Sequence, residues 1–153
     1  MAAYSFGKAF FEPGDVVLVT EMEHHSNLVP WQMMCEDRGG RLLVAPIDDD
    51  GNLLIDEFTK IVEQYRPKLV AVTHVSNVLG TVNPIKLLAE IVHRHGGRIL
   101  VDGAQAIPHI KIDVRDADVD FYAFSGHKLY GPNGVGVLYG KAELLEAMPP
   151  AQG

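Results

Sequence analysis

The sequence predicts an α/β fold of three layers, in which helices cover both faces of a mostly parallel β-sheet. Short runs of Val, Ile and Leu alternate along the chain with helix-length segments, and each of these segments has one apolar stripe. The strand-like runs are apolar on both faces, which is typical of strands buried between two helical layers. At 153 residues the chain has the size of one domain.

Four strands are expected before residue 103, over residues 16–20, 42–46, 69–74 and 98–102, because each is a short β-branched and aliphatic run. Apolar residues recur at helical spacing over residues 55–65 and 87–95. Asn83 and Pro84 are expected to cap and open the second helix, and Gly96 and Gly97 to end it.

Polar residues gather just after three of these strands, in segments 21–25, 74–77 and 102–105. Parallel sheets bind ligands beyond the carboxyl ends of their strands, so these segments predict a site at that edge. After residue 118 the pattern changes. Residues 121–124 and 135–139 are strand-like and are joined by residues 125–134 with no helix expected between them. This spacing predicts a hairpin-type connection with a functional loop, followed by a short helix over residues 142–148.

The composition disfavours several partners. The 20 acidic and 13 basic residues give a net charge of -7, and no run of Lys or Arg could follow a phosphate backbone, so nucleic acid is not expected. No apolar stretch is long enough to cross a bilayer, and no membrane association is expected. Cys35, the only cysteine, allows no internal disulfide and favours a cytoplasmic location.

Two other features have structural interpretations. The acidic run at residues 48–50 precedes a Gly-Asn pair and predicts a solvated turn rather than a metal site. Cys35 lies in a helical stretch with Trp31 and Met34, which predicts a buried thiol that packs as a small hydrophobic group.

Lys128 and Asp102 are the residues that could carry chemistry. Lys128 follows an apolar strand and precedes a glycine-rich turn, where partial burial favours an amine nucleophile toward a carbonyl cofactor. Most lysines are only solvated surface residues. Asp102 ends a strand and could hold a charge against a pyridinium nitrogen, or could simply cap the turn at Gly103. His24 and His25 lack a third ligand at a fitting spacing, so no metal site is expected.

Five segments, taken in order, resemble the class V aminotransferase family. They are EMEHHSN at 21–27, PWQ at 30–32, THVSNVLGT at 73–81, VDGAQA at 101–106 and FSGHKLYGP at 124–132. Within the family they are most similar to the SUF-type cysteine desulfurases and selenocysteine lyases. The likeness runs over nearly the whole chain, which makes it far more specific than any single motif.

The resemblance implies the large domain of a fold-type I transferase with pyridoxal 5′-phosphate as cofactor. Lys128 would form an imine with the cofactor and later move the proton. Asp102 would pair with the pyridine nitrogen, and Gln105 would form a hydrogen bond with the ring hydroxyl.

The remaining site residues come from three segments. His24, a second catalytic candidate, would stack on the cofactor ring. Ser125 and His127 lie two residues apart, and so on the same side of an extended segment, from which they would reach the phosphate. Asn77 would lie near the carboxylate of the substrate.

The activity that the resemblance implies is conversion of L-cysteine to L-alanine, with the sulfur held by the enzyme for iron–sulfur cluster assembly. L-selenocysteine is the other candidate substrate. The resemblance also implies a homodimer and a possible sulfur-acceptor protein. Family members carry a glycine-threonine segment before the matching region, and after it a small domain with the persulfide-forming cysteine and an arginine. We therefore expect residues 1–153 to be a partial large domain, with no second domain and little or no turnover.

Two other functions compete. One is a catalytically inactive remnant that binds pyridoxal phosphate or a partner. The other is a different class V enzyme, kynureninase-like or an aminotransferase. Segments 23–27 and 74–77 look more like those of a desulfurase.

Overall fold

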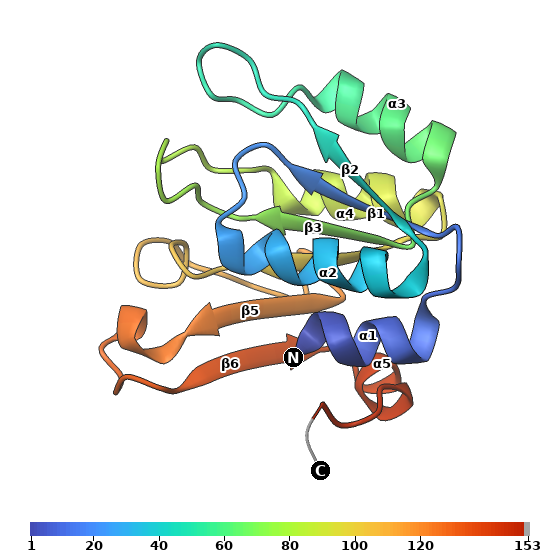
Figure 1. The fold of residues 1–153 in the computed structure, drawn as a ribbon. Helices are drawn as coiled ribbons and strands as arrows, with labels where there is room; N and C mark the ends of the chain where they lie inside the picture. The colour runs from blue at the N-terminus through green and yellow to red at the C-terminus, as the bar shows by residue number, and fades with distance from the viewer. Residues whose placement is uncertain (152–153) are drawn as a thin grey trace.

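The computed structural model describes residues 1–151 and contains a six-stranded sheet of order β2-β1-β3-β4-β5-β6 (Figure 1). The strands are β1 (Val16–Thr20), β2 (Arg41–Ala45), β3 (Leu69–Thr73), β4 (Arg98–Asp102), β5 (Phe121–Ser125) and β6 (Gly136–Gly140). The first five strands run parallel, whereas β6 pairs antiparallel with β5. The predicted, mostly parallel sheet is confirmed, and the four strands expected before residue 103 lie within one residue of their predicted bounds.

Helices cover both faces of the sheet. They are α1 (Ala2–Phe10), α2 (Val29–Arg38), α3 (Ile55–Tyr65), α4 (Ile85–Arg94) and α5 (Ala142–Ala147), with 3-10 helices η1 (His25–Asn27) and η2 (Gly126–Leu129). Within residues 1–151, none of these helices combines the length and the apolar character that a membrane span needs.

Alternate residues along each strand build two separate cores. Leu18, Val72 and Val101 pack with α3 and α4 on one face of the sheet. Val19 and Leu100 pack with α1 and α2 on the other face. Because side chains alternate across a strand, a continuous apolar run fills both cores at once, and the three-layer prediction is confirmed.

Helix α1 was not predicted. Its Phe6 is 1% exposed and lies edge-on to Trp31 and Phe121, with ring centroids 6.2 Å away in each case. Tertiary packing of this ring therefore holds a short helix that contains Gly7, a residue with low helix propensity.

Two local predictions are wrong. Asn83 does not cap α4: the cap position is Pro84, and the Asn83 amide instead donates to the carbonyl of Thr73 (2.8 Å). The predicted hairpin between β5 and β6 is confirmed, but its loop contains η2. His127 therefore lies in a helical turn, and the idea that it shares one side of an extended segment with Ser125 fails.

The two structural interpretations are confirmed. The Asp48 carboxylate accepts the backbone N–H groups of Asp50 (3.0 Å) and Asn52 (2.8 Å), which closes the acidic turn. Cys35 is 3% exposed in the core beside Trp31, and burial raises its thiol pKa to about 11.

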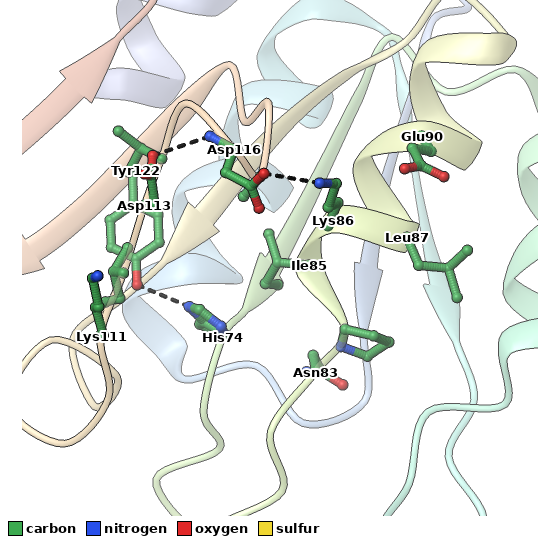
Figure 2. A pocket seen from close by; sticks show the side chains of 14 residues that line it. His74, Asn83, Ile85, Lys86, Leu87, Glu90, Lys111, Asp113, Asp116 and Tyr122 are labelled. Atoms are coloured by element: carbon green, nitrogen blue, oxygen red, sulfur yellow. Dashed lines mark hydrogen bonds and ion pairs between the residues drawn. The ribbon is translucent and has the colours of Figure 1, made fainter.

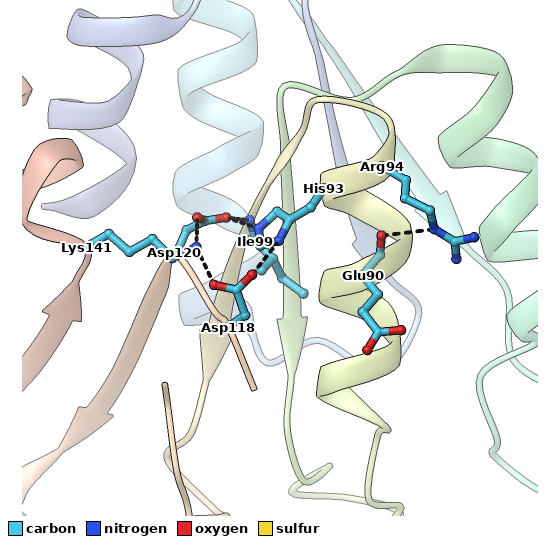
Figure 3. A network of polar contacts seen from close by, with 7 residues as sticks. All are labelled: Glu90, His93, Arg94, Ile99, Asp118, Asp120 and Lys141. Carbon is cyan, nitrogen blue, oxygen red and sulfur yellow. Dashed lines mark hydrogen bonds and ion pairs between the residues drawn. The ribbon is translucent and has the colours of Figure 1, made fainter. Parts of the chain in front are cut away.

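A polar network ties the amino ends of β4 and β5 to α4 (Figure 3). Asp120 is 4% exposed, and its carboxylate accepts hydrogen bonds from His93 Nε2 (2.8 Å), the Ile99 N–H (2.7 Å) and Lys141 Nζ (3.0 Å). Asp118 pairs with the same His93 and Lys141, but its side chain is 64% exposed. Thus one buried acid fixes the sheet edge opposite the predicted site.

Candidate active site

The carboxyl ends of β3, β4 and β5 bring the predicted acid to the centre of the sheet edge. Asp102 pairs in register with Thr73 on one side and Ala123 on the other. Ser125 lies two residues beyond Ala123, so its side chain is on the same face of the sheet as Asp102. This is the face that α1 and α2 cover.

A cavity of about 450 Å³ opens beside this acid. Its walls come from β4, β5 and β6, from η1 and α2, and from the start of α1, and include Asp102, Ser125, Asn27 and Trp31. Small-molecule sites typically enclose roughly 300–1,000 Å³. The space is therefore large enough for a substituted aromatic ring against a carboxylate.

The Asp102 carboxylate is fixed through one oxygen. Oδ1 accepts the N–H of Ala104 at 2.9 Å, so the turn-capping interpretation of this residue is correct. The turn thus orients the carboxylate in the wall of the cavity.

Lys128 lies three residues beyond Ser125, in η2, and is half-buried. His127 in the same turn is exposed, and Gln105 is half-buried in the loop after β4. These three residues line neither the cavity beside Asp102 nor the one described next.

His24 and Asn77 meet in a second cavity, of about 420 Å³, on the loops that follow β1 and β3. Both side chains are exposed. The Nδ1 atom of His24 accepts the N–H of Ser26 (3.1 Å), which orients the imidazole at the start of η1. The structure therefore joins the predicted residues in two groups, Asp102 with Ser125 and His24 with Asn77.

A groove of about 800 Å³ on the other face of the sheet contains none of the predicted residues (Figure 2). Tyr122 and His74 lie on one side, with the tyrosine oxygen 3.0 Å from His74 Nδ1. Burial, followed by the charge of Asp102, raises the Tyr122 pKa well above its usual range, and burial lowers the pKa of His74. Both shifts favour the neutral forms of the two groups, which share this hydrogen bond.

Comparison with known proteins decides the family. The sequence profile described as aminotransferase class V matches residues 1–153. The chain belongs to this family. It is 56% identical over its whole length to a cysteine desulfurase of Dickeya dadantii and 52% identical to a probable cysteine desulfurase of Mycolicibacterium paratuberculosis. It covers 37% and 22% of these two relatives.

Solved structures of cysteine desulfurases are similar to the chain. The cysteine desulfurase CsdA of Escherichia coli matches 99% of this chain with a TM-score of 0.91 and 39% identity. The cysteine desulfurase of Thermococcus onnurineus matches 98% with a TM-score of 0.89 and 36% identity. The chain covers 39% and 38% of these two structures. The fold predicted from the family resemblance is confirmed.

Glu23 was not among the predicted site residues, but its carboxylate accepts three hydrogen bonds at this edge of the sheet. Oε1 of Glu23 accepts hydrogen bonds from the Thr20 hydroxyl (2.6 Å) and the backbone N–H of Thr73 (2.9 Å). Oε2 accepts a hydrogen bond from Asn27 Nδ2 (2.7 Å). The available signal was an acid placed between a fully buried strand and the predicted ring-stacking histidine, His24.

Glu23 should make the stability of the chain depend on pH. Burial raises its pKa from 4.5 to about 7, against hydrogen bonds that lower it, and the charge of Asp102 adds to the rise. A carboxyl group whose pKa is higher in the folded state than in the unfolded state contributes its full stability below the unfolded-state pKa. This contribution is lost as pH rises through the folded-state pKa. Between pH 4.5 and pH 8 the wild type should lose up to about 3 kcal/mol more unfolding free energy than Glu23→Gln. Urea unfolding across this range measures the difference, and parallel pH curves for the two proteins would contradict it.

Proposed function

We propose that residues 1–153 are the cofactor-holding part of a pyridoxal-phosphate-dependent cysteine desulfurase, which converts L-cysteine to L-alanine and retains the sulfur for iron–sulfur cluster assembly. The observation that carries the proposal is the cavity of about 450 Å³ between Asp102 and Ser125, at the carboxyl edge of a parallel sheet. The relatives at 56% and 52% identity that are named cysteine desulfurase or probable cysteine desulfurase support it.

Asp102 suits the role of partner to the ring nitrogen. Oδ1 is held by the Ala104 N–H, which fixes a negative charge that would keep a pyridine nitrogen protonated. We assign Gln105 to the ring hydroxyl, and Ser125 and His127 to the phosphate. Pyridoxal phosphate, when bound, supplies an electron sink for the carbanion that forms on an amino-acid substrate.

We assign the covalent attachment of the cofactor and the movement of the proton to Lys128. Its half-buried position, three residues beyond Ser125, supports this role because the strand that carries Ser125 also delivers the lysine to the carboxyl edge. We assign ring stacking to His24 and the substrate carboxylate to Asn77, and their shared cavity of about 420 Å³ supports both roles.

The sulfur-accepting thiol is proposed to lie outside residues 1–153. Cys35 is the only cysteine, it is 3% exposed, and burial raises its pKa to about 11, so a nucleophilic thiolate is disfavoured there. The chain covers 37% of the Dickeya desulfurase, which supports our proposal that residues 1–153 are a partial large domain with little turnover alone.

The loops that carry the assigned residues expose apolar side chains. Val78, next to Asn77, is 81% exposed, and Tyr130, two residues beyond Lys128, is 95% exposed. Exposed apolar groups beside a site mark a surface for another protein segment. We propose that a second subunit of a homodimer covers these side chains. We further propose a sulfur-acceptor protein as a partner, L-cysteine or L-selenocysteine as the substrate, and the cytoplasm as the location.

Borohydride reduction followed by peptide mass analysis tests the proposal directly. The purified chain should develop visible absorbance with pyridoxal phosphate, and reduction should leave the cofactor mass on the peptide that contains Lys128. Label spread over several surface lysines would overturn the assignment. Release of alanine and sulfide from cysteine by this chain alone would overturn the partial-domain proposal. Binding without turnover, even after the remaining sequence is supplied, would favour the inactive remnant.

A further inference from the structure

The carboxylate of Glu23 joins three elements at the sheet edge. It accepts the Thr20 hydroxyl at the end of β1 and the Thr73 N–H at the end of β3, a residue 50 positions away. Its second oxygen accepts Asn27 Nδ2, in η1. Thr73 is the register partner of Asp102. Glu23 therefore contacts the strand next to the one that carries Asp102, whose carboxylate is proposed to bind the cofactor.

The network continues from η1 into α2. Asn27 is 5% exposed, and its Oδ1 accepts the indole N–H of Trp31 (3.2 Å), which is 2% exposed. The backbone N–H of Asn27 donates to the carbonyl of His24 (2.8 Å). His24 is therefore held from both directions along the chain, by Glu23 immediately before it and by Asn27 after it.

We propose that Glu23 is a positioning residue that locks the His24–Trp31 segment to β1 and β3 and so sets the place of His24 relative to Asp102. The inference rests on the proposed function, because His24 and Asp102 matter together only if they hold one cofactor. Asn27 lines the cavity beside Asp102 and Glu23 lines the cavity at His24, but the role proposed here acts through the segment that they hold in place.

The direction of the hydrogen bonds makes the proposal specific. The Thr73 N–H can only donate, so the group at position 23 must present an acceptor there. In Glu23→Gln the amide nitrogen would then face Asn27 Nδ2, another donor. Rotating the Asn27 amide only moves the conflict to the Trp31 N–H. A mismatch therefore remains in every arrangement of the single variant.

The exchanged pair Glu23→Gln with Asn27→Asp removes this mismatch. The new glutamine amide donates to one aspartate oxygen, and the other oxygen accepts the Trp31 N–H. The net charge equals that of the wild type, because the carboxylate is moved from position 23 to position 27. Asn27→Asp alone instead brings two carboxylates together.

A double-mutant cycle on this pair, measured with pyridoxal phosphate, tests the role. We expect each single variant to weaken cofactor affinity roughly tenfold and the exchanged pair to return to within about twofold of the wild type. Without cofactor, NMR of the indole N–H of Trp31, the only tryptophan, should show a shift in each single variant and recovery in the pair. Asp120→Asn, at the opposite sheet edge, is the control: it lowers stability without a change in affinity.

The outcomes separate the two proposals. If the wild type binds no cofactor at Lys128, the proposed function fails and the positioning role fails with it. If the wild type binds and both single variants bind equally well, or if the exchanged pair binds as weakly as they do, only the positioning role is overturned. If Glu23→Gln does not fold, Asn27→Asp and the exchanged pair carry the same comparison.

Discussion

Replacing Lys128 by alanine is expected to abolish the visible absorbance of the chain with pyridoxal phosphate and to weaken cofactor affinity by roughly a hundredfold or more, equivalent to about 2.7 kcal/mol. The reason is that the variant loses the one amine assigned to covalent attachment, while Asp102 and Ser125 keep their places in the cavity wall. Absorbance titration gives both quantities in one experiment.

Lys86→Ala is the matched control for this variant. Lys86 is an exposed lysine of α4 that pairs with Asp116 (2.9 Å) in the groove on the other face of the sheet. The Lys86→Ala substitution removes the same charge as Lys128→Ala, and it should leave cofactor affinity and absorbance at wild-type values. Equal losses in the two variants would mean that the chain binds pyridoxal phosphate through general charge attraction, and the assignment of Lys128 would be wrong.

The sheet could be predicted from the sequence because burial on both faces leaves a local signal. All five residues of β1 and all five of β3 are buried, and the first four of each are apolar, so both strands could be placed to within one residue. Helix α3 was equally visible, since its buried Phe58 and Val62 recur at helical spacing. These elements are specified within a few neighbouring residues.

The missed features depend on residues far apart in the chain. Helix α1 is held by the contacts of Phe6 with Trp31 and Phe121. The place of Glu23 between a buried strand and His24 was a local signal, but its bridging contacts depend on Thr73, which is 50 residues away. The turn at His127 is a local failure, because a single turn of 3-10 helix has no apolar period from which to predict it.

Replacing Asp120 by alanine is expected to lower the free energy of unfolding by roughly 3–5 kcal/mol. The carboxylate is 4% exposed, and its loss leaves Lys141 and His93 without their buried partner and the Ile99 N–H without an acceptor (Figure 3). A buried donor that loses its acceptor keeps the full cost of its removal from water. Urea denaturation at neutral pH measures the change.

Asp118→Asn separates burial from charge, because asparagine keeps the left-handed backbone (φ 52°) of this position better than alanine would. Asp118 pairs with the same His93 and Lys141, at 3.3 and 2.7 Å, but its side chain is 64% exposed. Exposed ion pairs typically contribute about 1 kcal/mol or less, so this variant should be nearly as stable as the wild type. Equal destabilisation by the two substitutions would show that the charge pair, rather than the buried carboxylate, stabilises this edge. Since Asp120 precedes β5 and Ser125 ends it, neither variant should change cofactor affinity.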